Sequence, residues 1–180
     1  MDLFSHRIIE KFREKRSKQL APLARFLLKV HLTANRLTLI SLLCGIASAY
    51  FLFDNYLLFL IFGLLHLLGD GLDGVVARVQ GVSKYGPYLD FWSDRLIAVL
   101  YLIKVGLYLQ ENYVFAALLL MLLTHSISFF TQFRYKSVYS RLVIFIGLAL
   151  NLPVAAYLAA GAISLYSLTL QFKFWLEKRR

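Results

Sequence analysis

The chain has 180 residues, of which 59% are hydrophobic and 16% aromatic, and its formal net charge is +10. This composition excludes a disordered or nucleic-acid-binding tail and predicts an integral membrane protein built from helices. Most of the basic residues flank the apolar runs, so the positive charge fits a membrane protein with no nucleic-acid partner.

Residues 1–34 form a basic amphipathic segment. Apolar residues recur at helical spacing from Leu3 to Leu27, and lysines and arginines lie between them. We expect an interfacial helix that lies along an anionic membrane face in contact with membrane lipids. A solvated helix without lipid contact is the alternative.

Apolar spans follow at residues 36–53, 56–78, 88–109, 113–134, 138–151 and 154–172. Several approach the length of about 20 residues that crosses a hydrocarbon core. The sequence Asn151-Leu152-Pro153 is a turn signal that separates the short fifth span from the sixth. We predict an all-α bundle of six transmembrane helices over residues 35–172 and a basic cytoplasmic tail at residues 173–180. Five spans with a re-entrant piece is the alternative.

The charges between the spans predict an orientation. Lysine and arginine gather at residues 1–29, 78–84, 134–141 and 177–180, whereas the opposite connections, around Asp54, Glu111 and Asn151, contain neither. By the positive-inside rule, both termini are expected in the cytoplasm of a multi-pass protein of the cell membrane.

Four of the ten acidic residues fall within one 25-residue stretch, in the cytoplasmic halves of the second and third spans: Asp70, Asp73, Asp90 and Asp94. A carboxylate in hydrocarbon is costly, so such residues are normally paired, metal-bound or functional. Their spacings place each pair on one helical face, and the short connection makes the two helices antiparallel neighbours. Carboxylates without histidine or cysteine suit Mg²⁺ or Mn²⁺, and four of them suit two ions that orient a phosphoryl group.

Small residues surround the first pair. Gly69, Gly71, Gly74 and Ala77 leave this helix thin, so that either a bulky ligand or a neighbouring helix can approach its backbone. Arg78 is placed either to meet a phosphate with its planar fork or to anchor the helix at the interface.

Together these residues resemble the signature of the CDP-alcohol phosphotransferases, integral membrane enzymes of phospholipid synthesis. The matching pattern is Asp70-x-x-Asp73-Gly74-x-x-Ala77-Arg78 followed by Gly86-x-x-x-Asp90-x-x-x-Asp94. The segment Asn35-Arg36-Leu37-Thr38 is similar to the family's Asn-x-x-Thr. One departure is that seven residues separate Arg78 from Gly86, where the family commonly has eight.

The resemblance implies that Asp70, Asp73 and Asp90 hold the metal ions and that Asp94 completes the site and acts as general base. The implied reaction transfers a phosphatidyl group, or its ether-lipid equivalent, from a CDP-linked lipid to the hydroxyl of a small polar acceptor and releases CMP. The residues implied for nucleotide and CDP-lipid binding are Asn35, Thr38, Gly74, Ala77, Arg78, Ser83 and Gly86. A homodimer is also expected from the family.

Basic residues at the mouth between the fourth and fifth spans are candidates for acceptor binding. Arg134, Lys136 and Arg141 gather there, and Lys84 is a further contributor. Such a group suits a phosphorylated polyol, either inositol phosphate or glycerol 3-phosphate, and the alternative is positive-inside residues without a ligand. The sequence Asp94-Arg95 is similar to the inositol-phosphate and archaeal branches of the family more than to the glycerol-phosphate branch.

Two other functions fit parts of the pattern. Intramembrane carboxylates also form cation or proton paths, but here they gather at one level, and no internal repeat typical of transporters is visible. A catalytically inactive scaffold is disfavoured because all four aspartates are present. Of the other intramembrane polar residues, His66 is expected to be a packed, hydrogen-bonded histidine more than a partner of Asp70, and Lys104 to extend outward.

Overall fold

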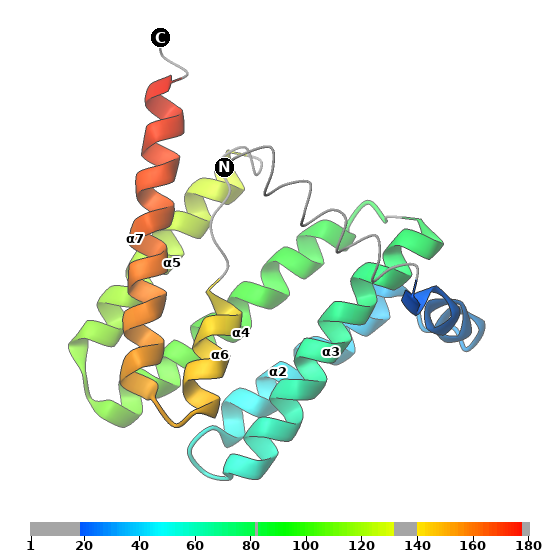
Figure 1. The fold of residues 1–180 in the computed structure, drawn as a ribbon, viewed down its shortest axis with the longest axis horizontal. Helices are drawn as coiled ribbons and strands as arrows, with labels where there is room; N and C mark the ends of the chain where they lie inside the picture. Colours follow the sequence, from blue (N-terminus) through cyan, green and yellow to red (C-terminus); the bar gives the residue numbers. More distant parts are fainter. Residues whose placement is uncertain (1–18, 82, 132–139, 178–180) are drawn as a thin grey trace. The chain divides into compact units, whose positions relative to one another are not determined.

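The computed structural model describes residues 19–81, 83–131 and 140–177. Within these ranges the chain is helical, with short connections and no strand. A helical stretch at residues 19–29 is followed by α2 (Ala34–Phe51), α3 (Tyr56–Gln80), α4 (Gly86–Leu109), α5 (Asn112–Phe130), α6 (Arg141–Ala149) and α7 (Pro153–Glu177) (Figure 1). The predicted all-α class is confirmed for the described residues, and each predicted span overlaps a helix, although the fourth and fifth spans extend into residues 132–139, which lie outside the described ranges.

Four of the described helices, α2, α3, α5 and α7, are long and apolar enough to cross a membrane. α4 has 24 residues but carries the charged side chains of Asp90, Asp94, Arg95 and Lys104. α6 has nine residues; at 1.5 Å per residue, it covers less than half of a core of about 30 Å. The structure therefore supports a helical membrane protein, while the six-span count and the interfacial position of the N-terminal segment remain predictions.

The predicted turn at Asn151 is confirmed. Asn151 adopts a φ of 57°, its N–H donates to the Leu148 carbonyl at 3.0 Å, and the Leu152 N–H donates to the Gly147 carbonyl at 2.8 Å. These paired bonds are the Schellman termination, in which a left-handed residue satisfies the last carbonyls of a helix. Pro153 then opens α7 at the helical position that requires no N–H.

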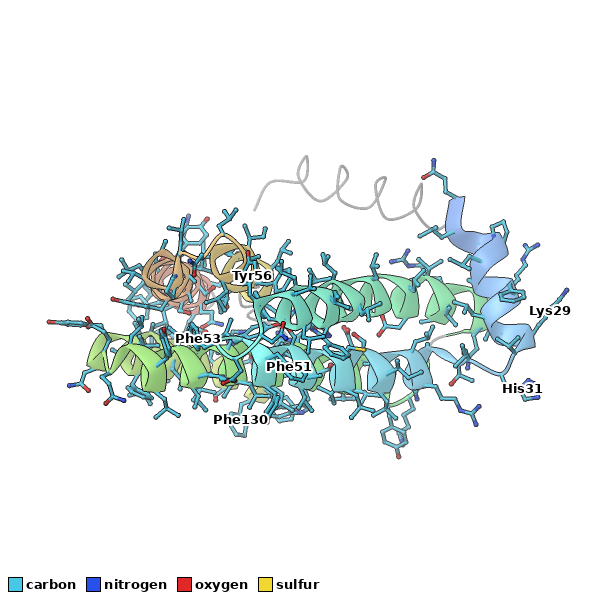
Figure 2. All side chains as sticks on the ribbon, turned by 90° about the horizontal axis from the view of Figure 1, so that it is seen from below. Lys29, His31, Phe51, Phe53, Tyr56 and Phe130 are labelled. Carbon is cyan, nitrogen blue, oxygen red and sulfur yellow. The ribbon has the colours of Figure 1, made fainter. Side chains whose placement is uncertain are left out.

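The chain divides into two compact units, and the first contains the residues up to Ser48 together with Ile61–Ser93. Its core is Ala24, Leu37, Val75 and Val76, with the partly buried Leu20, Leu27, Leu28 and Ala34 packed against it. Residues 19–29 thus pack on α2 and α3 through one apolar side. Lys29 ends this helical stretch and His31 lies in the turn that follows, and both are exposed (Figure 2).

The second unit contains Ala49–Leu60 and the residues from Asp94 onward. In it α7 packs against α5 and α6 (Figure 1), and the buried rings of Phe59, Tyr101 and Phe145 contact one another. Phe51 ends α2, Phe53 lies in the connection between α2 and α3, and Tyr56 begins α3; all three are labelled in Figure 2. Lys104 forms an ion pair of 2.7 Å with Asp54 in this connection.

Candidate functional site

Asp70 and Asp90 bring two carboxylates together in the first unit. Asp70 lies in the second half of α3 and Asp90 near the start of α4, and one carboxylate oxygen of each lies within 4.8 Å of the other. Asp94 follows one turn later on α4, where the second unit begins. Oxygen donors as close as those of Asp70, which is half-buried, and Asp90, which is exposed, suit a hard divalent cation. The donor chemistry thus fits the expected Mg²⁺ or Mn²⁺.

Asp73 is held differently. It is buried on α3, and the hydroxyl of Thr38 on α2 donates to its Oδ2 at 2.6 Å. A hydrogen bond to a charged acceptor contributes about 1.5–3 kcal/mol, more than an ordinary one. Thr38, predicted as a nucleotide-binding residue, therefore contacts a predicted metal ligand in this structure.

A hydrogen-bond relay joins the start of α2 to the start of α4. The Ser83 hydroxyl donates to Oδ1 of Asn35 at 3.1 Å, and the Gly86 N–H donates to Oγ of Ser83 at 2.9 Å. A Cβ at Gly86 would lie 2.8 Å from that Oγ and 3.4 Å from Asn35 Oδ1, so the relay requires glycine there. The structure thus brings together three residues that the resemblance implies for nucleotide binding: Asn35, Ser83 and Gly86.

Gly74 borders open space. A Cβ built at Gly74 would meet no neighbouring atom of the described residues within 4 Å. Ala77 is half-buried one turn later, and Arg78 is exposed near the C-terminal end of α3. This side of α3 therefore leaves the backbone accessible and ends in a cationic side chain, as a phosphate-bearing ligand requires.

In the second unit, Asp94 forms an ion pair with the guanidinium of Arg141, which opens α6. Both side chains are about seven-eighths buried. They border a small cavity whose lining is Asp94, Arg95, Ala98, His125, Ser140 and Arg141. The predicted general base and one predicted acceptor-binding residue thus share a largely buried environment that contains charged side chains.

The other predicted acceptor-binding residues are not gathered there by any described contact. The ammonium of Lys84, in the first unit, lies over the ring of its neighbour Tyr85, 5.6 Å from the ring centroid. Arg134 and Lys136 lie outside the described residues.

Two features of the site were not predicted. Arg95 is 6% exposed and lines the cavity beside Asp94 and Arg141; an arginine directly after an intramembrane aspartate was a usable signal, since buried cations in spans are rare. The second is the contact between Ser41 on α2 and His66 on α3, at 2.9 Å between Oγ and Nδ1. For His66, the expectation of a packed, hydrogen-bonded histidine is confirmed.

Known proteins are similar to this chain in sequence and in fold. The sequence model of the CDP-alcohol phosphatidyltransferase family matches residues 31–177. The chain is 34% identical over 103 residues to an archaetidylinositol phosphate synthase of Pyrococcus horikoshii, covering 55% of this chain and 55% of that protein. It is 34% identical over 113 residues to a bifunctional IPC transferase and DIPP synthase of Aquifex aeolicus, covering 59% of this chain and 26% of that protein.

The chain therefore spans about half of the first of these relatives and about a quarter of the second. Its fold is similar to that of a phosphatidylinositol phosphate synthase of Mycobacterium tuberculosis (PgsA1), solved with CDP-DAG bound. The TM-score is 0.66 at 18% identity, and the match covers 84% of this chain and 89% of that one. Because the family match extends over most of the sequence, the chain belongs to the CDP-alcohol phosphatidyltransferase family.

Proposed function

We propose that this protein transfers a phosphatidyl group, or its ether-lipid equivalent, from a CDP-linked lipid to the hydroxyl of a phosphorylated polyol and releases CMP. The observation that carries the proposal is the approach of the Asp70 and Asp90 carboxylates within 4.8 Å, in a chain that belongs to a family of such transferases. In this reaction the acceptor oxygen forms a bond to the phosphorus that bears the lipid. The bond from that phosphorus to the CMP oxygen breaks.

Asp70, Asp73 and Asp90, completed by Asp94, would hold Mg²⁺ or Mn²⁺, and we propose two ions. Bound there, they would neutralise the diphosphate and stabilise charge on the departing CMP. Carboxylates as close as those of Asp70 and Asp90 repel each other unless a cation lies between them, and their approach supports a metal ion at this place.

For the donor, we propose that the open side of α3 at Gly74, together with Ala77 and Arg78, receives the cytidine diphosphate. The absence of any described neighbour within 4 Å of a Cβ at Gly74 supports this assignment. The relay of Asn35, Ser83 and Gly86 would support the nucleotide by fixing the connection between α3 and α4.

For the acceptor, we propose that Asp94 takes the proton of the attacking hydroxyl. Its ion pair with Arg141 keeps the carboxylate oriented. Arg95 and Arg141, which line the cavity with Asp94, offer two guanidinium groups to an acceptor phosphate. Two cations next to the base favour an anionic acceptor. Since two of the similar proteins are inositol phosphate-lipid synthases by name, inositol phosphate is the proposed acceptor ahead of glycerol 3-phosphate.

We further propose that the six predicted spans cross the cell membrane, with the termini and the site in the cytoplasm, and that the protein forms a homodimer. Connections between helices support the orientation, because those at Asp54, Glu111 and Asn151 contain no lysine or arginine. Single cysteines placed at these positions in a Cys44→Ala background would react with an impermeant maleimide from outside the cell. Labelling only after the cells are opened would contradict the orientation.

The decisive experiment is CMP release by the purified full chain in mixed micelles with CDP-diacylglycerol and Mg²⁺. The acceptor arms are inositol phosphate, glycerol 3-phosphate, inositol and no acceptor. We expect release with inositol phosphate that is lost in Asp94→Asn. Release with glycerol 3-phosphate alone would show that glycerol 3-phosphate, and not inositol phosphate, is the acceptor. No release with any arm would refute the proposed transferase activity.

A further inference from the structure

The contact between Thr38 and Asp73 joins two buried side chains on different helices. Thr38 is 6% exposed and Asp73 is 5% exposed. The Thr38 hydroxyl lies 2.6 Å from Asp73 Oδ2 and 3.1 Å from the carbonyl of Ala34 in its own helix. A hydroxyl carries one proton, and the shorter contact to a carboxylate receives it. The carbonyl of Ala34 is then the weaker, alternative acceptor.

This hydrogen bond sets Asp73 apart from the other aspartates. Asp70 and Asp90 are more accessible, and their oxygens approach each other. Asp73 lies one turn further along α3 and is oriented by a side chain of α2. Partners of this kind, which hold a ligand without touching the metal, commonly tune metal affinity.

The contact between Ser41 and His66 holds α2 and α3 at the separation that allows this bond, and Ser41 lies one helical turn after Thr38. The Ser41 hydroxyl donates to the His66 carbonyl at 2.7 Å, and His66 Nδ1 lies 2.9 Å from the Ser41 carbonyl. With the proton on Nδ1, the two residues exchange hydrogen bonds reciprocally. Both are 2% exposed.

Gly69 completes this contact. A Cβ at Gly69 would lie 2.9 Å from Cβ of Ser41 and 3.4 Å from its Cα, so α2 and α3 approach closely here. Ser41 is three residues after Thr38, and Gly69 is four residues before Asp73, so each pair shares a helical face. The same close approach therefore brings Thr38 within reach of Asp73.

We propose that Thr38 is a positioning residue for the metal site: its hydroxyl holds the Asp73 carboxylate in place for a divalent cation, in a register fixed by Ser41, His66 and Gly69. This inference rests on the proposed function, because it assumes that Asp73 is a metal ligand. It differs from the nucleotide contact predicted for Thr38, because it acts before any CDP-lipid is bound.

The test is a titration of the purified full chain with Mn²⁺, followed by electron paramagnetic resonance in the absence of nucleotide and lipid substrate. Thr38→Val keeps the shape of the side chain and removes the hydroxyl, and we expect its affinity for Mn²⁺ to fall about tenfold or more. Thr38→Ser retains the hydroxyl and should stay within about twofold of the wild type. Thr38→Ala carries the same expectation as Thr38→Val, should the latter not fold.

Ser164→Ala is the matched control. Ser164 is also a buried hydroxyl-bearing residue of a long apolar helix, and its hydroxyl donates to the Ala160 carbonyl one turn earlier at 2.8 Å. We expect no change in Mn²⁺ affinity for this variant. A fall as large as that of Thr38→Val would mean that loss of any buried hydroxyl has this effect, and would overturn the positioning role.

The Asp73→Asn variant distinguishes a failure of the positioning role of Thr38 from a failure of the metal assignment of Asp73. If it weakens Mn²⁺ binding while Thr38→Val and Thr38→Ala bind like the wild type, the positioning role is overturned and the metal site stands. If Asp73→Asn leaves the affinity unchanged, the metal assignment in the proposed function fails and takes the positioning role with it.

Discussion

A single methyl group added at Gly74 should lower the activity of the enzyme without lowering its stability. A Cβ there meets nothing within 4 Å in the part of the chain that the structure describes, so Gly74→Ala introduces no clash with these residues in the substrate-free protein. Alanine is also the better helix former by about 1 kcal/mol. We therefore expect the thermal unfolding midpoint of Gly74→Ala to equal or exceed that of the wild type.

The effect on the donor should be unfavourable. If the diphosphate approaches the α3 backbone at Gly74, the new methyl group occupies part of that space. An overpacked contact costs about 1–3 kcal/mol, which corresponds to a rise of about 5- to 150-fold in the KM for CDP-diacylglycerol. The measurement is initial CMP release at varied CDP-diacylglycerol and saturating acceptor, with unfolding followed by intrinsic tryptophan fluorescence.

Gly69→Ala is the matched control, because the same substitution five positions earlier meets a filled space. Its Cβ would lie 2.9 Å from Cβ of Ser41, so overpacking of about 1–3 kcal/mol outweighs or cancels the gain in helix propensity. We expect its unfolding midpoint to fall below that of Gly74→Ala. A Gly74→Ala enzyme with KM within twofold of the wild type would refute the approach of the donor to this side of α3.

Three further outcomes follow from the site. Asp94→Asn should abolish CMP release while CDP-diacylglycerol binding persists; retained turnover would exclude Asp94 as the base. Arg141→Lys keeps the charge but loses the planar fork, so the KM for inositol phosphate should rise about tenfold with the donor KM within twofold, and a change in the donor KM alone would contradict its placement. Ser83→Ala removes the bridge between Asn35 and Gly86 and should lower the free energy of unfolding by about 1 kcal/mol, measured as a lower unfolding midpoint; an unchanged midpoint would show that the relay is not stabilising.

Much of the helical framework was predictable because hydropathy and turn chemistry act locally. The break before Pro153 follows from residues that close one helix and open the next, and the structure has that turn at Asn151. The approach of Asp70 and Asp90 was predictable from spacing, since a short connection makes their helices antiparallel neighbours. Such arguments need only the period of a helix and the length of a loop.

Contacts between side chains of different helices were less predictable. Nothing in the spacing of Thr38 indicates that its hydroxyl meets Asp73, because that depends on the rotation of α2 about its axis. Arg95 illustrates the same limit: its position beside Asp94 is visible in the sequence, but its burial depends on packing by α5 and α6. The role of Arg134 and Lys136 stays a prediction.

The contacts that orient Asp73 are local in the chain. The helical hairpin of α2 and α3, which precedes α4, carries all of the residues that make them: Thr38, Ser41, His66 and Gly69. Since chains fold progressively from the N-terminal end during synthesis, this hairpin is complete while α5, α6 and α7 have yet to leave the ribosome. The first carboxylates of the site are therefore expected to be oriented during membrane insertion, so that the later helices are added to a geometry that already exists.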